Sequence, residues 1–145
     1  MVVAIGKNSK LIERVAQLYQ SVEREICNNV PLAEHCSKCG RCCNFKTFGH
    51  YLFVTPPEIL YLIAKIGEKN INPVHNGICP YNIDGKCCIY EHRFASCRIF
   101  FCKADADFQS RLTESALKEL KSICLRFQIP YSYFDLEAAL NKFSG

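Results

Sequence analysis

The arrangement of the cysteines constrains this chain more than any other feature of its sequence. Eight of the eleven cysteines fall into two clusters. The first is the run Cys36-Ser-Lys-Cys39-Gly-Arg-Cys42-Cys43, and the second comprises Cys79, Cys87, Cys97 and Cys102. Thiolates at such spacing bind zinc or iron–sulfur clusters. The sequence therefore predicts that two distant segments share a metal centre.

The length of the chain, 145 residues, fits a single domain over residues 1–145, with residues 36–102 as its metal-binding core. A domain of about 150 residues buries about 70% of its unfolded surface, so the cysteines are not needed as staples. The sequence shows neither a signal peptide nor an apolar run of membrane-spanning length. We therefore expect a cytoplasmic protein with no membrane partner. In that reducing compartment, dense cysteines indicate metal or redox chemistry rather than disulfides.

The net charge of +4 is too small and too scattered to predict nucleic-acid binding. Much of the positive charge lies beside the cysteines, with Arg93 and Arg98 flanking Cys97. Such cations offset the negative charge of a thiolate centre, and Arg98 can donate hydrogen bonds to sulfur. Arg93 and Arg98 are therefore predicted to bind and tune the cofactor. A solvated basic face is the alternative.

Apolar residues recur at helical spacing in four segments. The first predicted helix covers residues 9–27, with Ser9 as its cap. The second follows Thr55, where Pro56 and Glu58 complete a capping box, and ends at Gly67. The third covers residues 111–127, and Asp135 caps a short final helix. Residues predicted to face inward on the third helix are Leu112, Leu117, Leu120, Ile123, Leu125 and Phe127.

These helices predict a mainly α fold: a small single domain of three to four helices with two long cysteine-rich loops joined by the metal centre. The loops cover residues 28–54 and 68–110. Loops of about 25 residues without structure of their own are uncommon, and a metal would order both. Of the three remaining cysteines, Cys27 and Cys124 are predicted to pack as small apolar residues.

The spacing leaves the metal open. Cys36, Cys39 and Cys42 match the first three ligands of a ferredoxin-type run, and Cys79 before Pro80 resembles its remote fourth ligand. A Cys-x-x-Cys pair also forms half of a zinc site. Eight thiols could form two four-cysteine sites, or one cluster with four further thiols. Because adjacent side chains diverge, Cys43 should face a second site or support the first, and one of Cys87 and Cys88 should point away.

No catalytic residues are predicted, because the chain contains no nucleophile elbow, phosphate loop or dinucleotide fingerprint. The ferredoxin-like spacing favours an iron–sulfur cluster, [4Fe-4S], with a redox or accessory role and a protein partner. The alternative is a structural zinc module that binds protein or nucleic acid. Tyr90 and Phe94 are predicted to pack over the centre and exclude water.

Several separate motifs together resemble one known family. They are the run from Cys36 to Cys43, Thr55-Pro-Pro-Glu58-Ile59, Ile78-Cys79-Pro-Tyr, Gly85-Lys-Cys87-Cys-Ile89-Tyr90-Glu-His-Arg93, and Cys97-Arg98. In this order they resemble the YkgJ-like cysteine-cluster family, a zinc- or iron-chelating CxxCxxCC domain. The resemblance covers residues 36–102. It implies that Cys87, rather than Cys88, is the ligand, and it departs from the family pattern at Phe94, where a proline is usual.

Overall fold

The computed structural model describes residues 5–29, 52–74, 78–83, 86–99, 105–132 and 134–143. This part of the chain is mainly helical, as predicted. Its α-helices are α1 (Ile5–Asn29), α3 (Pro56–Ile66), α4 (Ala95–Ile99), α5 (Ala106–Arg126) and α6 (Leu136–Phe143). Two 3-10 helices are η3 (Glu68–Asn70) and η4 (Tyr90–His92). The strands form two antiparallel pairs, β1 (Phe53–Val54) with β4 (Phe134–Asp135), and β2 (Asn82–Ile83) with β3 (Lys86–Cys87).

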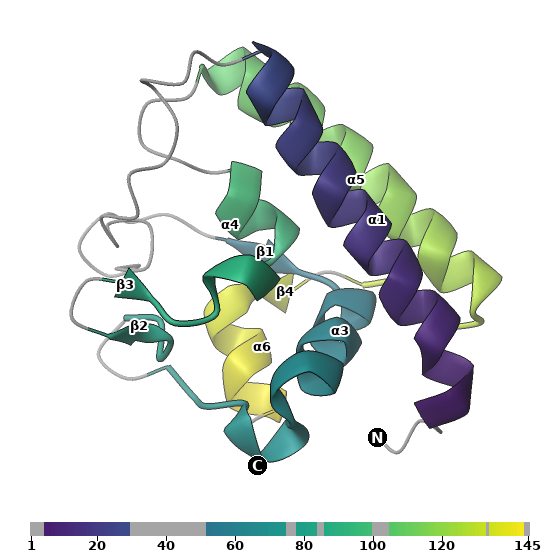
Figure 1. The fold of residues 1–145 in the computed structure, drawn as a ribbon, viewed down its shortest axis with the longest axis vertical. Coiled ribbons are helices and arrows are strands. Elements are labelled where there is room, and N and C mark those ends of the chain that lie inside the picture. The colour runs from purple at the N-terminus through teal and green to yellow at the C-terminus, as the bar shows by residue number, and fades with distance from the viewer. Residues whose placement is uncertain are drawn as a thin grey trace.

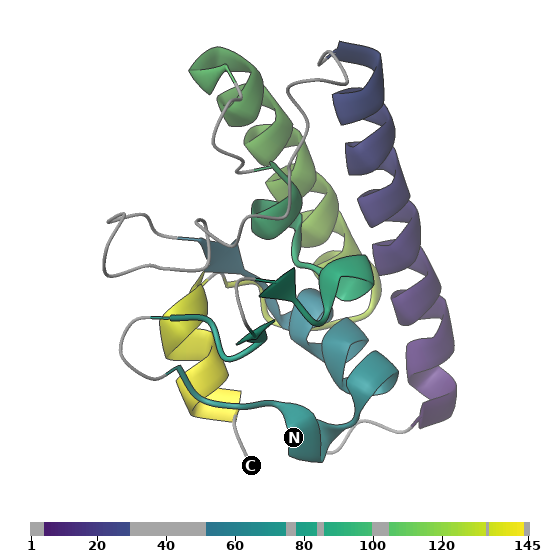
Figure 2. The same cartoon turned by 60° about the vertical axis from the view of Figure 1, so that its left-hand side comes forward.

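The two long helices lie on one side of the molecule, and the β2–β3 hairpin that carries Cys87 lies on the other (Figure 1). Helices α1 and α5 run side by side, while α6 and the β2–β3 hairpin lie opposite them (Figures 1 and 2). Helices α3 and α4 lie between these two sides and both contact α1. No described helix is long and apolar enough to cross a membrane.

Helix α1 buries the predicted stripe of apolar side chains: Leu11, Val15, Leu18, Val22 and Ile26. The helix begins at Ile5, so Ser9 lies inside it and the predicted cap is wrong. Sequence periodicity locates the stripe and not the ends, because a helix can extend past its buried face. Cys27 is exposed rather than packed, because it lies about 100° around the helix from Ile26.

Helix α3 begins and ends where the sequence predicts. Thr55 is the N-cap, and its backbone N–H donates to the Glu58 carboxylate at 3.2 Å, the Glu58 half of the capping box. Gly67 ends the helix with φ of 90°, a conformation that side chains other than glycine rarely adopt.

Helix α5 begins at Ala106, five residues before the predicted start, because Asp105 caps it. The Asp105 carboxylate accepts from the Phe108 backbone N–H at 2.9 Å. Leu112, Leu120, Ile123 and Cys124 are buried as predicted, whereas Leu117 and Phe127 are half-buried. Leu125 is 74% exposed, so its predicted inward position is wrong. It lies on the far side of the helix from Leu120.

The interpretation of residues 68–110 as mostly loop is wrong in part. This segment contains η3, the β2–β3 hairpin, η4, α4 and the start of α5. Cys97 therefore lies in a helix and not in a loop. Helix α4 has five residues, too few to display a helical period in the sequence. At the final helix, Asp135 accepts from the Ala138 backbone N–H at 3.4 Å, in agreement with the predicted cap.

Two groups of buried side chains form the interior. The helical core joins α1, α5 and parts of α3 and α4, and includes Val15, Leu60, Ile99 and Leu120. A second group, here called the cysteine-side core, joins the other face of α3 to α6 and to the segment that carries the second cysteine cluster. Its buried members are Leu52, Val54, Ile59, Leu62, Ile71, Val74, Cys79, Tyr81, Ile89, Phe94, Leu136, Ala139 and Leu140. Helix α3 thus connects both cores.

Candidate metal centre

Three of the eight predicted metal ligands belong to the part of the chain that the structure describes: Cys79, Cys87 and Cys97. The other five lie outside the described residues, namely Cys36, Cys39, Cys42, Cys43 and Cys102. The grouping of Cys79 with the first cluster is therefore not tested by the described part.

Cys79 and Cys87 are brought together by the β2–β3 hairpin. Cys79 precedes β2 in a turn, where its carbonyl accepts from the Asn82 backbone N–H at 3.0 Å. Asn82 in turn pairs with Cys87 across the hairpin. Cys79 is buried in the cysteine-side core, and Cys87 packs against that core. The next residue, Cys88, is exposed. Cys88 lies in the turn after β3, and the two neighbours differ in burial.

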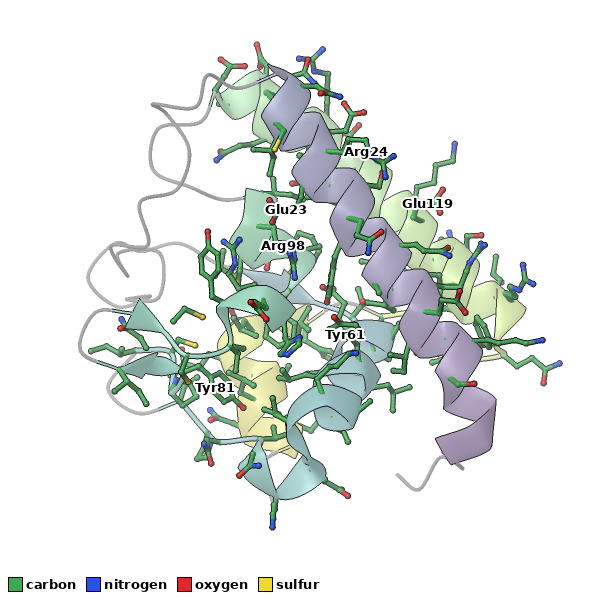
Figure 3. All side chains as sticks on the ribbon, in the orientation of Figure 1. Glu23, Arg24, Tyr61, Tyr81, Arg98 and Glu119 are labelled. Carbon is green, nitrogen blue, oxygen red and sulfur yellow. The ribbon has the colours of Figure 1, made fainter. Side chains whose placement is uncertain are left out.

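Cys97 reaches the same core from a helix. It lies in α4, is half-buried, and packs against the cysteine-side core. Phe94, at 1% exposure, is the largest fully buried side chain of that core. Side chains that carry sulfur are visible beside the β2–β3 hairpin and Tyr81 (Figure 3). A turn, a strand and a helix therefore direct three predicted ligands onto one core.

These three thiols do not make a metal site by themselves. Within the described ranges, no group of three or more His, Cys, Asp or Glu side chains could hold a metal ion. Thiolates are nevertheless the donors that zinc and iron–sulfur clusters take. A centre that uses Cys79, Cys87 or Cys97 would have to include further ligands from the segments outside the described residues.

Arg98 is almost fully buried and is held on several sides. Its side chain is 8% exposed and stacks over the Tyr19 ring, with 4.3 Å between the guanidinium carbon and the ring centroid. Its Nε donates to the Arg93 carbonyl at 2.9 Å, and Nη2 donates to the Glu91 carbonyl at 3.0 Å. Its Nη1 pairs with Glu23 at 3.1 Å. The described contacts of this guanidinium are thus with oxygen and an aromatic ring.

Arg93 is held in a similar way. It stacks over the Tyr90 ring, with 3.7 Å between the guanidinium carbon and the ring centroid, and its Nε donates to the Tyr90 carbonyl at 3.0 Å. Its Nη1 donates to the Cys97 carbonyl at 3.4 Å, and Nη2 pairs with Glu23 at 3.3 Å. Arg93 therefore contacts the backbone of a predicted ligand. We call Glu23, Arg93 and Arg98 the Glu23 clamp (Figure 3 labels Glu23 and Arg98).

A second carboxylate, that of Glu58, is fully buried where α1, α3 and α4 meet. Its Oε2 accepts from the Tyr19 hydroxyl at 3.0 Å and from the Ala95 backbone N–H at 2.7 Å. Its Oε1 accepts from the backbone N–H and the hydroxyl of Thr55. Burial raises the pKa of Glu58, and these hydrogen bonds oppose the rise. Burial, followed by the nearby Glu58 charge, raises the pKa of Tyr19.

The sequence does not reveal the wider roles of Glu58 and Glu23. The capping box identifies Glu58 as a helix cap, but its bonds to Tyr19 and Ala95 join residues 39 and 37 positions away. Glu23 lies on a predicted helix without any motif around it. Its partner Arg98 is 75 positions away, so only the fold brings the two together.

Comparison of the chain with models of known protein families, with curated proteins and with solved structures gave no match. The resemblance to the YkgJ-like family therefore stays a prediction that depends on the motifs themselves.

Proposed function

We propose that this protein binds a metal centre through cysteine thiolates, with a [4Fe-4S] cluster favoured and a redox or accessory role. The ligands would come from Cys36, Cys39, Cys42, Cys43, Cys79, Cys87, Cys97 and Cys102. One observation carries the proposal: Cys79, Cys87 and Cys97 reach the same core from three different local structures. Such a cluster would supply electron transfer or redox sensing.

The charge of the Glu23 clamp also supports this proposal. Two nearly buried guanidinium groups share one carboxylate oxygen, so the clamp holds more positive than negative charge. Buried charge is costly unless an opposite charge lies nearby. Metal centres with several thiolate ligands carry net negative charge and would provide it. Arg93, bonded to the Cys97 carbonyl, is well placed for this role.

The second candidate is a structural zinc module that presents a surface to a protein or nucleic acid. The sparse secondary structure between residues 78 and 99 favours it, since the strands there have two residues each and the helices three and five. A metal that cross-links such a segment contributes directly to its folding. The abundance of thiols fits a reducing, cytoplasmic setting for either candidate.

Metal and sulfide analysis of protein prepared without oxygen tests the proposal. We expect a brown protein with about four iron and four sulfide per chain, which bleaches with oxidant. Stoichiometric zinc without sulfide would support the zinc module and overturn the iron–sulfur proposal. Protein that binds neither metal overturns both.

Paired cysteine variants then test the ligand assignment. Cys79→Ser should reduce the bound metal, because serine does not provide a thiolate. Cys27→Ser is the matched control, since Cys27 is exposed on α1 and is not a predicted ligand. Equal metal content in both variants would remove Cys79 from the ligand set.

A further inference from the structure

Helix α4, which carries Cys97, depends on contacts made by other elements. Its five residues are too few for an independently stable helix. At its start, the Ala95 backbone N–H donates to Glu58 of α3. The Ser96 hydroxyl donates to the Phe53 carbonyl of β1 at 2.7 Å. The position of Cys97 is therefore set by distant parts of the chain.

The Glu23 clamp fixes the segment immediately around Cys97. Arg98 bonds to the carbonyls of Glu91 and Arg93, which precede α4. Arg93 bonds to the carbonyls of Tyr90 and Cys97 on either side of it. Four backbone carbonyls between residues 90 and 97 thus depend on two guanidinium groups. Moving either group would move the backbone that carries the Cys97 thiol.

Glu23 holds both guanidinium groups from helix α1. Its Oε1 lies 3.3 Å from Arg93 Nη2 and 3.1 Å from Arg98 Nη1. Among the described residues, it is the only carboxylate in an ion pair with either arginine. Its side chain is 39% exposed, because it lines an open groove of about 450 Å³ between α1, α3, η4 and α4. A substitution at Glu23 therefore alters the clamp without removing a buried side chain.

We propose that Glu23 is a positioning residue for the metal centre: through Arg93 and Arg98 it sets the place of Cys97 and the charge beside it. This inference depends on the proposed metal-binding function. The role is expected of groups that hold a ligand without touching the metal, which commonly change metal affinity by about 10-fold to 100-fold when removed. Because α1 carries no cysteine of either cluster, the centre would depend on a helix outside them.

The test compares Glu23→Gln with Glu13→Gln, an exposed glutamate on the same helix. Zinc affinity is measured by competition with a chelator, and Co²⁺ spectra report the ligand geometry. In metal-free protein, the alkylation rate of Cys97 is measured by mass spectrometry, with exposed Cys88 as the internal reference. We expect Glu23→Gln to weaken zinc by about 10-fold or more, to change the Co²⁺ spectrum and to increase Cys97 alkylation. Glu13→Gln should match the wild type in all three.

The outcomes separate this inference from the proposed function. Wild-type protein that binds no zinc, no Co²⁺ and no iron–sulfur cluster overturns both. If it binds only the cluster, the iron and sulfide content of each variant replaces zinc affinity as the readout. If the wild type binds metal and Glu23→Gln binds it with the same affinity, the positioning role alone is overturned. This holds even if Cys97 is alkylated faster in the variant. Glu23→Asp keeps the charge on a shorter side chain and gives the same readouts if the glutamine variant does not fold. In that case an affinity for Glu23→Asp below that of the wild type supports the inference, whereas wild-type affinity with unchanged Cys97 alkylation contradicts it.

Discussion

The buried carboxylate of Glu58 gives the sharpest prediction about stability. It accepts four hydrogen bonds, from the Tyr19 hydroxyl, the Ala95 N–H and the two donors of Thr55. In Glu58→Gln one carboxylate oxygen becomes an amide nitrogen, which cannot accept. A hydroxyl can rotate to accept from that nitrogen, but a backbone N–H cannot. Each carboxylate oxygen serves one backbone N–H, so either placement of the amide leaves one buried donor unpaired.

The expected loss follows from that unpaired donor. A buried donor without an acceptor costs about 1–3 kcal/mol. In a domain of about 150 residues, each 1 kcal/mol lowers Tm by about 2–4 °C, so we expect Tm to fall by at least about 2 °C at neutral pH. Thermal unfolding followed by circular dichroism measures the change, with the exposed Glu13→Gln as the matched control.

The pH dependence gives the same substitution a second readout. Burial raises the pKa of Glu58 in the folded state above its ordinary value. At a pH between the unfolded-state and folded-state pKa of Glu58, the folded protein binds more protons than the unfolded chain. The carboxyl of Glu58 therefore stabilises the protein at low pH, and this contribution is lost as pH rises through the folded-state pKa. Glu58→Gln removes this pH dependence, so the loss of Tm in the variant relative to the wild type should be larger at about pH 4 than at about pH 7. An unchanged Tm, or a deficit that grows with pH, would refute the reasoning.

Three further predictions concern the fold and the metal. Gly67→Ala should destabilise the protein by about 1–3 kcal/mol in urea unfolding, because the φ of 90° is unfavourable for alanine even though its Cβ would meet no neighbour closer than 3.7 Å; an equal midpoint would contradict the described helix end. Leu120→Ala should cost about 2–5 kcal/mol because Leu120 is fully buried, whereas Leu125→Ala on the same helix should stay within about 0.5 kcal/mol; equal losses would be inconsistent with the orientation of α5. Removal of the metal by a chelator should increase hydrogen exchange in residues 78–99 and leave α1 and α5 protected, because the helical core contains no predicted ligand; uniform deprotection would show that the two cores unfold together.

The predicted helices are those whose stability is visible in local sequence. Regular apolar spacing identified α1, α3, α5 and α6, and the capping residues Thr55 and Asp135 located two of their starts. Ser9 shows that a capping residue in the sequence is not sufficient, because α1 begins at Ile5 and contains Ser9. Leu125 was misplaced because a leucine beside a buried stripe looks the same in sequence as one within it. Burial depends on the partner helix, which the sequence does not specify locally.

In the candidate site, too, the features set by neighbouring residues could be predicted, and those set by distant contacts could not. The expectation that one of the adjacent Cys87 and Cys88 points away needs only their adjacency, and Cys88 is indeed exposed whereas Cys87 packs against the cysteine-side core. Helix α4 could not, because its five residues are held by Glu58, Phe53 and the Glu23 clamp rather than by a pattern of their own. The cysteines indicate metal chemistry, but the two carboxylates that contact α4 or its arginine come from α1 and α3, which carry no cluster cysteine.

The polar contacts of Glu58, Tyr19 and the Glu23 clamp connect the helical core to the cysteine-side core. The Tyr19 ring carries Arg98 on its face, and its hydroxyl donates to Glu58. Tyr19 belongs to the helical core, whereas Arg93 contacts the carbonyl of Cys97, which packs on the cysteine-side core. A polar chain therefore runs from Glu58 through Tyr19 and Arg98 to Glu23, Arg93 and Cys97. Because every residue of this chain is buried or half-buried, we expect a substitution at one end to alter the hydrogen bonds at the other end more strongly than in a solvent-exposed network. The double variant Glu58→Gln with Glu23→Gln tests this coupling: a combined loss of stability equal to the sum of the single losses would show that the two carboxylates hold α4 independently.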